Sequence, residues 1–141
     1  MEWCDMLLIP PNYGLCLRIY HPHLNPEEIT NRLGLIPETA WMAGGRRQTP
    51  TGRLLDGVNN LSYWCHTFET ADEIGPNEFL SHIFKILLPN RDFFENAVST
   101  DGRAELYFTI RRCENAGDIL RFAILKNFVE LNIDLSIELF P

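Results

Sequence analysis

Hydrophobic and polar residues alternate along several stretches of this chain, which is the pattern of a β-strand with one buried face. The alternation is clearest in Tyr13–His21, Ala104–Arg111 and Ile133–Phe140. Two further stretches, Pro37–Met42 and Leu61–Phe68, are also predicted strands, and we expect them to pair antiparallel around the loop that joins them. The pattern therefore predicts a sheet of about five strands.

A short helix is predicted after the first strand. Asn25 is a favourable N-cap residue, Pro26 suits the first helical position, and Glu28 can complete a capping box. Gly34 stands where a left-handed C-cap is expected. The helix should therefore contain only about two turns.

Three more helices are predicted in the second half of the chain. Gly75–Pro76 begins one of them, in which large apolar residues recur at three- and four-residue spacing. Pro89 must break or kink this helix, and Asn90 is predicted to cap the next one. The last helix is expected within Leu120–Leu131.

The elements thus follow the order strand, helix, strand, strand, helix, helix, strand, helix, strand. This order predicts an α+β fold: a mixed, mainly antiparallel sheet with helices packed on one face, ferredoxin-like in part. The length of 141 residues fits a single domain over residues 1–141, and 45% hydrophobic and 11% aromatic residues are typical of a globular chain.

Charge limits the classes of partner. Twelve Lys and Arg against nineteen Asp and Glu give a net charge of −7. Such a chain is repelled by nucleic-acid phosphates and by acidic membrane surfaces, so nucleic-acid binding and membrane binding are disfavoured. A protein partner is favoured instead, and a homodimer is compatible with the composition.

Cysteine usage and the N-terminus indicate the compartment. Cys4, Cys16, Cys65 and Cys113 form no Cys-x-x-Cys pair and are interpreted as buried free thiols of a reducing environment. Met-Glu-Trp-Cys-Asp at the N-terminus lacks the basic start and apolar core of a secretory signal. A cytoplasmic location is therefore expected.

The stretch Gly44–Arg53 holds Arg46, Arg47 and Arg53, with no acidic residue between Glu38 and Asp56. A flexible loop rich in guanidinium donors attracts carboxylates or phosphates. Its glycine spacing is not that of a P-loop. Three interpretations stay open: a solvated hairpin loop whose arginines pair with surface carboxylates, a contact for a protein partner, or a nucleotide-phosphate site.

Aromatic residues on the strands are the second group of candidates, because aromatic and arginine side chains carry much of the energy of protein interfaces. Most of these rings are expected in the core. If Tyr107 with Arg111, or Trp64 with His66, faces outward on an uncovered sheet, they form a binding surface.

Residues for catalysis or metal binding are not apparent in the sequence. His21 and His23 could form a metal site with Cys16 or Cys65, but no third ligand stands at a recognisable spacing. No serine or cysteine lies in a nucleophile motif such as Gly-x-Ser-x-Gly. We therefore predict no catalytic residue, no metal and no cofactor.

The chain resembles the bacterial "domain of unknown function 4279" family. The resemblance is carried by Leu24–Trp41, the glycine and arginine loop, Tyr63–Trp64 and the ending Leu131–Phe140. It implies a small cytosolic bacterial α+β protein, and some members of the family are expected to act as immunity partners of toxins. The first eleven residues and the helix break at Pro89 depart from the family pattern.

Together these features favour a non-enzymatic protein-binding module. An immunity or regulatory protein of this kind would hold its partner, such as a toxin or effector, on an open sheet face and on the arginine loop. The alternative is a domain that binds a small ligand or a nucleotide phosphate through Gly44–Arg53.

Overall fold

The structure is a computed structural model that describes residues 12–69, 74–111 and 117–141. Its elements are β1 (Tyr13–His21), α1 (Pro26–Leu33), β2 (Thr39–Trp41), β3 (Arg46–Gln48), β4 (Leu54–Val58), β5 (Ser62–Phe68), α2 (Pro76–Leu87), the 3-10 turn η1 (Leu88–Asn90), α3 (Arg91–Ser99), β6 (Arg103–Arg111), α4 (Phe122–Glu130) and β7 (Ile133–Phe140). The predicted α+β class is confirmed.

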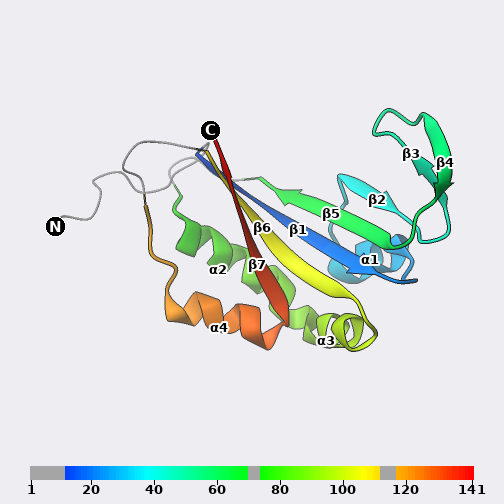
Figure 1. Ribbon diagram of the computed structural model, residues 1–141. Coiled ribbons are helices and arrows are strands. Elements are labelled where there is room, and N and C mark those ends of the chain that lie inside the picture. Colours follow the sequence, from blue (N-terminus) through cyan, green and yellow to red (C-terminus); the bar gives the residue numbers. More distant parts are fainter. Residues whose placement is uncertain (1–11, 70–73, 112–116) are drawn as a thin grey trace.

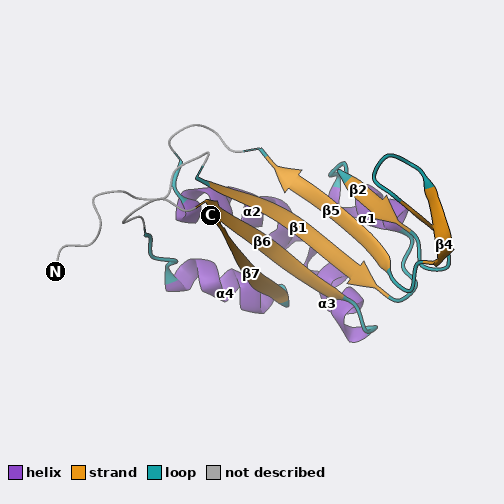
Figure 2. Cartoon of the chain, turned by 45° about the horizontal axis from the view of Figure 1, so that its top comes forward, coloured by secondary structure: helices purple, strands orange, loops and turns teal. Residues whose placement is uncertain are grey.

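Five strands form the main sheet, in the order β2-β5-β1-β6-β7. Strand β5 lies antiparallel between β1 and β2, β6 is antiparallel to β1, and β7 is parallel to β6. The part from β1 to β6 thus contains the split strand-helix-strand arrangement of ferredoxin-like folds, to which α4 and β7 add a parallel unit. The helices lie on one face of the sheet (Figures 1 and 2).

The core lies between this sheet and the helices. Leu15, Leu17 and Ile19 point toward the helices from β1 and are fully buried, as are Leu80 and Leu87 of α2. Burying a side chain of this size contributes about 1.5–3 kcal/mol. The apolar positions of the alternating pattern in β1 therefore face the core, and the polar positions face the opposite side of the sheet.

The ends of α1 follow the local signals. The side chain of Asn25 accepts a hydrogen bond from the backbone N–H of Glu27 at 3.0 Å, and Gly34 adopts the left-handed conformation with φ 68°. Pro89 lies in η1, so the predicted break is confirmed. Asn90 occupies the N-cap position of α3, as predicted, but its side chain makes no capping hydrogen bond, and its amide donates to the carbonyl of Ile86.

The stretch Gly44–Arg53 is not the flexible loop that was expected. Strands β3 and β4 pair antiparallel into a separate two-stranded hairpin, with Arg46 opposite Val58 and Gln48 opposite Leu54. Figure 1 shows this hairpin beyond the ends of β2 and β5, on the side away from α2, α3 and α4.

Within the described residues, no helix is long and apolar enough to cross a bilayer.

Candidate binding face of the sheet

The outer face of the main sheet is the face that points away from the helices. No described element covers it (Figure 2). Because side chains alternate along a strand, Cys16, Arg18 and Tyr20 of β1 lie on this face. Their cross-strand neighbours decide which chemistry the face offers.

A row of three aromatic rings crosses three strands of the outer face. Trp41 of β2 lies opposite Tyr63 of β5, which lies opposite Tyr20 of β1. The ring centroids are 4.5 Å apart for Trp41 and Tyr63, and 5.0 Å apart for Tyr63 and Tyr20. The guanidinium of Arg103 in β6 extends the row, 4.3 Å from the centre of the Tyr20 ring. We name these four side chains the ring row.

Arg18 organises the neighbouring part of the face. Its guanidinium carbon lies 3.7 Å from the centre of the Tyr107 ring, and its Nη2 lies 2.6 Å from Oε1 of Glu105. The Arg18 Nε donates to the same carboxylate oxygen at 2.7 Å. Both members of this ion pair are largely shielded from solvent. Arg18 therefore holds Tyr107 and Glu105 in fixed positions, which preorganises the face.

Two thiols meet beside Arg18. Cys16 of β1 and Cys65 of β5 are diagonal neighbours across the strand pair. A hydrogen bond from the Cys65 thiol lowers the pKa of Cys16 to about 6, although burial opposes this shift. The same hydrogen bond, together with burial, raises the pKa of Cys65. Cys16 is therefore the thiol that ionises first, and it lies half-buried on the outer face.

Among the strand residues predicted as candidates, Tyr107 and Arg111 lie on the outer face of β6. Trp64 does not, and its prediction as a binding residue is wrong. Its side chain is 0% exposed, and the indole N–H donates to the hydroxyl of Thr30 at 3.0 Å. His66 shares this inner side. Trp64 therefore stabilises the core and is not accessible to a partner.

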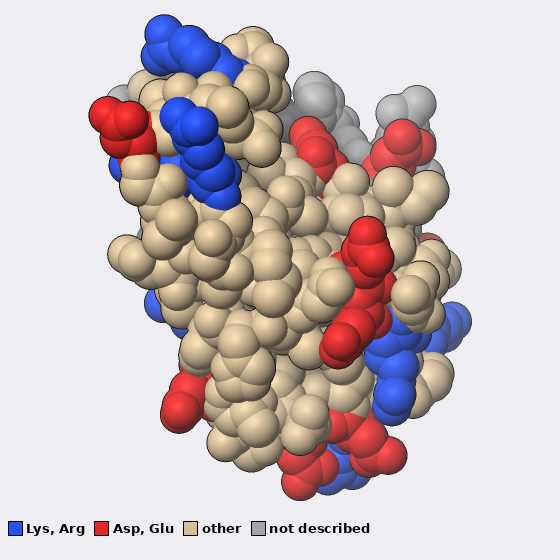
Figure 3. Space-filling view, turned by 90° about the vertical axis from the view of Figure 1, so that its right-hand side faces the viewer, with Lys and Arg blue, Asp and Glu red and all other residues tan. Residues whose placement is uncertain are grey.

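The three arginines of Gly44–Arg53 lie on the hairpin and are exposed. The Nε of Arg46 donates to the carbonyl of Leu55, and an Nη of Arg47 donates to the carbonyl of Asp56. The backbone N–H of Arg53 donates to the hydroxyl of Thr49, which fixes the turn. In the space-filling view, basic side chains gather at the top of the molecule, over the hairpin (Figure 3).

His21, the first of the two histidines considered for a metal site, is held by hydrogen bonds within the fold. The Nδ1 atom of buried His21 accepts hydrogen bonds from the backbone N–H groups of His23 and Leu24, and its Nε2 lies 2.8 Å from the hydroxyl of Thr100. His21 therefore faces the helices, opposite to Cys16. In the described part of the chain no group of three or more His, Cys, Asp or Glu side chains is placed to hold a metal.

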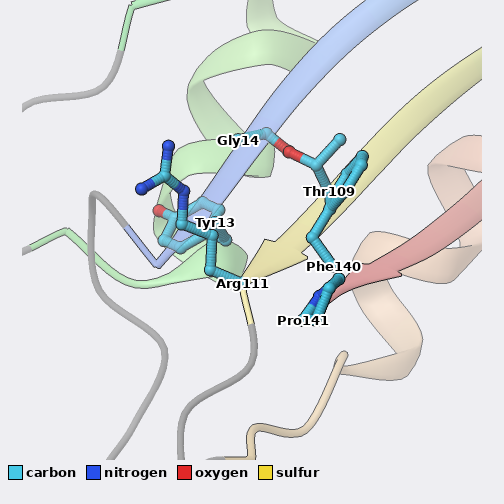
Figure 4. Close-up of a pocket in the computed structure, with 6 residues that line it drawn as sticks. All are labelled: Tyr13, Gly14, Thr109, Arg111, Phe140 and Pro141. Atoms are coloured by element: carbon cyan, nitrogen blue, oxygen red, sulfur yellow. The ribbon is translucent and has the colours of Figure 1, made fainter.

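A depression of about 590 Å³ lies at the end of the sheet where Tyr13, Arg111 and Phe140 meet. Figure 4 shows the side chains that line it, among them Arg111 and Tyr13. The hydroxyl of Tyr13 donates to the carbonyl of Ile74 and is not free for a ligand. Arg111 is thus the charged side chain that this depression offers.

Sequence reasoning missed Arg18, Arg103 and Tyr20 as members of the outer face, and it missed the contact between Cys16 and Cys65. A signal was present, because Arg18 and Tyr20 occupy the polar positions of a strand with a clear alternation. Which residues they contact depends on which strands lie beside β1, and the residues near them in the sequence do not specify those strands.

The chain matches a known protein family. A family model described as "Domain of unknown function (DUF4279)" matches residues 11–140. No curated protein and no solved structure matches the chain. The match covers nearly the whole chain, so the protein belongs to the DUF4279 family.

Proposed function

We propose that this protein is a non-enzymatic binding module that holds a partner protein on the outer face of its sheet. The observation that carries the proposal is the ring row, in which the tilted rings of Trp41, Tyr63 and Tyr20 follow one another and Arg103 extends the row on an uncovered face. Aromatic and arginine side chains are enriched among residues that dominate binding energy. Rings already held by their neighbours lose little conformational entropy on binding.

The hairpin extends this surface. Arg46, Arg47 and Arg53 are exposed on it and supply guanidinium groups, which recognise carboxylates by paired hydrogen bonds. We propose that the partner contacts the ring row with apolar groups and the hairpin with acidic ones. An immunity or regulatory role fits such a module, and the neighbouring free thiols Cys16 and Cys65 fit a cytoplasmic protein.

The test is affinity capture from the native host, followed by binding measurements with the purified partner. Trp41→Ala and Arg103→Ala should each weaken binding at least about tenfold, equivalent to ~1.4 kcal/mol. Ile36→Ala is the matched control, because Ile36 is an exposed apolar residue that lies outside the outer face. Equal affinity of all three variants and the native protein would sink the proposal.

A second candidate is a small phosphorylated ligand bound by the hairpin arginines. It is less favoured because Arg46 and Arg47 already donate to backbone carbonyls. Thermal-shift measurements with nucleotides decide this point. A ligand at about 100 times its Kd stabilises the fold by ~2.7 kcal/mol, and this gain should vanish in the Arg46→Ala, Arg47→Ala double variant.

A further inference from the structure

A second apolar surface lies at the opposite edge of the sheet from the hairpin. Five large side chains there are between 40% and 84% exposed. They are Phe122, Leu125 and Val129 of α4, and Ile137 and Leu139 of β7. We define them as the α4–β7 patch. Figures 1 and 2 both place α4 next to β7 at this edge.

The patch arises from two periodicities. Phe122, Leu125 and Val129 are spaced by three and four residues, so they form one stripe of α4, while Phe128 points from the other side into the core. Ile137 and Leu139 lie on the helix side of the sheet, in register with Phe108 and Ile110 of β6. Strand β7 thus extends past the cover that α4 provides.

The patch matches the largest apolar patch of a typical monomer, roughly 300–600 Å². A fully exposed Phe presents roughly 150–250 Å², so five side chains with these exposures present several hundred Å². Patches of this size are often functional, and larger ones mark interaction sites. The scale is comparable with the share of one partner in a standard interface, about 800 Å².

Strand β7 is also an edge strand with little protection. Proteins blunt sheet edges with short strands, inward-pointing charges or proline. The other edge strand, β2, has only 3 residues, whereas β7 has 8. The inward positions of β7 are Ile133, Leu135, Ile137 and Leu139, none of them charged. No other described strand pairs with its free edge.

We propose that two copies of this chain form a two-fold symmetric dimer in which their β7 strands pair antiparallel and their α4 stripes pack together. A two-fold axis perpendicular to the sheet keeps the helices of both copies on one face. It joins the two sheets into one and places α4 beside α4 of the second copy. The apolar stripe of each helix then meets an identical stripe.

The charges of β7 select the register. Two registers pair nearly the whole strand in this geometry, one centred on Ser136 and one centred on Ile137. The first places Asp134 opposite Glu138 of the second copy, and like charges in this position are destabilising. The second places Glu138 opposite Ser136, and Asp134 opposite Phe140. It also sets Ile137 opposite its own copy, so the geometry points to the register centred on Ile137.

The net charge of the chain makes the affinity of the dimer depend on salt. Each copy carries −7, so two copies repel at long range although the patch itself is uncharged. Salt screens this repulsion over a Debye length of about 8–10 Å at 0.10–0.15 M. Raising the ionic strength should therefore tighten the dimer, in contrast to an interface held by ion pairs.

Sedimentation equilibrium of the full chain tests the proposal. We expect a dimer whose Kd rises at least tenfold in Phe122→Lys and in Leu139→Lys. Ile36→Lys is the matched control, because Ile36 is 81% exposed but lies outside the patch. Circular dichroism checks that each variant is folded. A monomer at all concentrations up to about 0.5 mM, or a dimer that both patch variants leave unchanged, overturns the proposal.

Cysteine cross-linking tests the register. Directly opposite residues of antiparallel strands have Cα atoms about 4.5–5.5 Å apart, within reach of a disulfide. Ile137→Cys should therefore form a disulfide with its own copy under mild oxidation, identified by mass spectrometry of the joined peptides. Ser136→Cys should not, because two residues of strand separate the two copies of this position, whereas the register centred on Ser136 would join them. The reverse result would overturn the register centred on Ile137.

Discussion

The guanidinium of Arg18 stacks on the ring of Tyr107, with 3.7 Å between its central carbon and the ring centre. Strands β1 and β6 are far apart in sequence, and this contact ties together their outer faces. The same guanidinium pairs with Glu105 on β6. One side chain therefore satisfies a carboxylate and covers a ring on the surface that we propose as the binding face.

Replacement of Arg18 by Lys should show how much of the stabilisation by these two contacts depends on the planar guanidinium. Lysine keeps the charge but loses the stacking geometry, so we expect Arg18→Lys to lower the free energy of unfolding by about 1 kcal/mol. Urea denaturation measures it, with Arg111→Lys on the same face as the control. Equal losses in both variants would contradict a special role of Arg18.

The two tryptophans should respond in opposite ways. Trp64 is fully buried and its indole donates to Thr30, so Trp64→Phe should cost about 1–3 kcal/mol in the free energy of unfolding. Trp41 is 43% exposed, so Trp41→Phe should cost less than about 0.5 kcal/mol. Thermal and chemical denaturation give both values. A larger cost at Trp41 would contradict the burial of Trp64.

Alkylation of Cys16 by iodoacetamide should follow a thiolate with a pKa of about 6. The rate should rise around pH 6 and level off by pH 7, well below the range of an ordinary thiol, about 8.5. Cys65→Ala removes the hydrogen-bond donor and should move the midpoint to higher pH. Cys65→Ser keeps a donor and should hold the midpoint low. Mass spectrometry of the Cys16 peptide reports the rate, and an unchanged midpoint in Cys65→Ala would contradict the pairing.

Acid should weaken the fold through His21. Burial, with the nearby His23, lowers the pKa of His21 below its ordinary 6.5. The unfolded chain therefore binds a proton more readily than the folded protein does. The free energy of unfolding decreases as the pH falls through about 6.5, and it stops decreasing once the pH is below the pKa of His21 in the folded protein. His21→Gln should show a smaller drop in Tm between pH 7.5 and pH 5.5 than the native protein. His82→Gln, at an exposed histidine, should keep the native drop.

Local signals were enough for most of the elements. The alternation in Tyr13–His21 and Ile133–Phe140 predicted both strands, and Asn25 and Gly34 predicted the two ends of α1. These features depend on a few neighbouring residues, because capping and alternation act over one turn or one strand. The hairpin was missed because Arg46–Gln48 is short, exposed and without alternation, so pairing with β4 is what makes it a strand.

The candidate site was predicted less well. Tyr63 and Trp64 are adjacent aromatic residues, so the pattern alone did not decide which of them faces the core. Burial placed Trp64 inside and left Tyr63 on the outer face. In the same way, Cys16 and Cys65 stand 49 positions apart in the sequence, and only the register of β1 with β5 brings them together.

The sequence by itself determined the α+β class, the strands with clear alternation and the helix caps, because these follow from interactions between near neighbours. Only the tertiary structure decided the strand order, and with it the ring row, the Arg18 contacts, the thiol pair and the uncovered edge at β7. Each of these is a relation between strands that are distant in the chain. The physical reason is that such relations are set by packing of the whole sheet against its helices, which no single stretch of residues specifies.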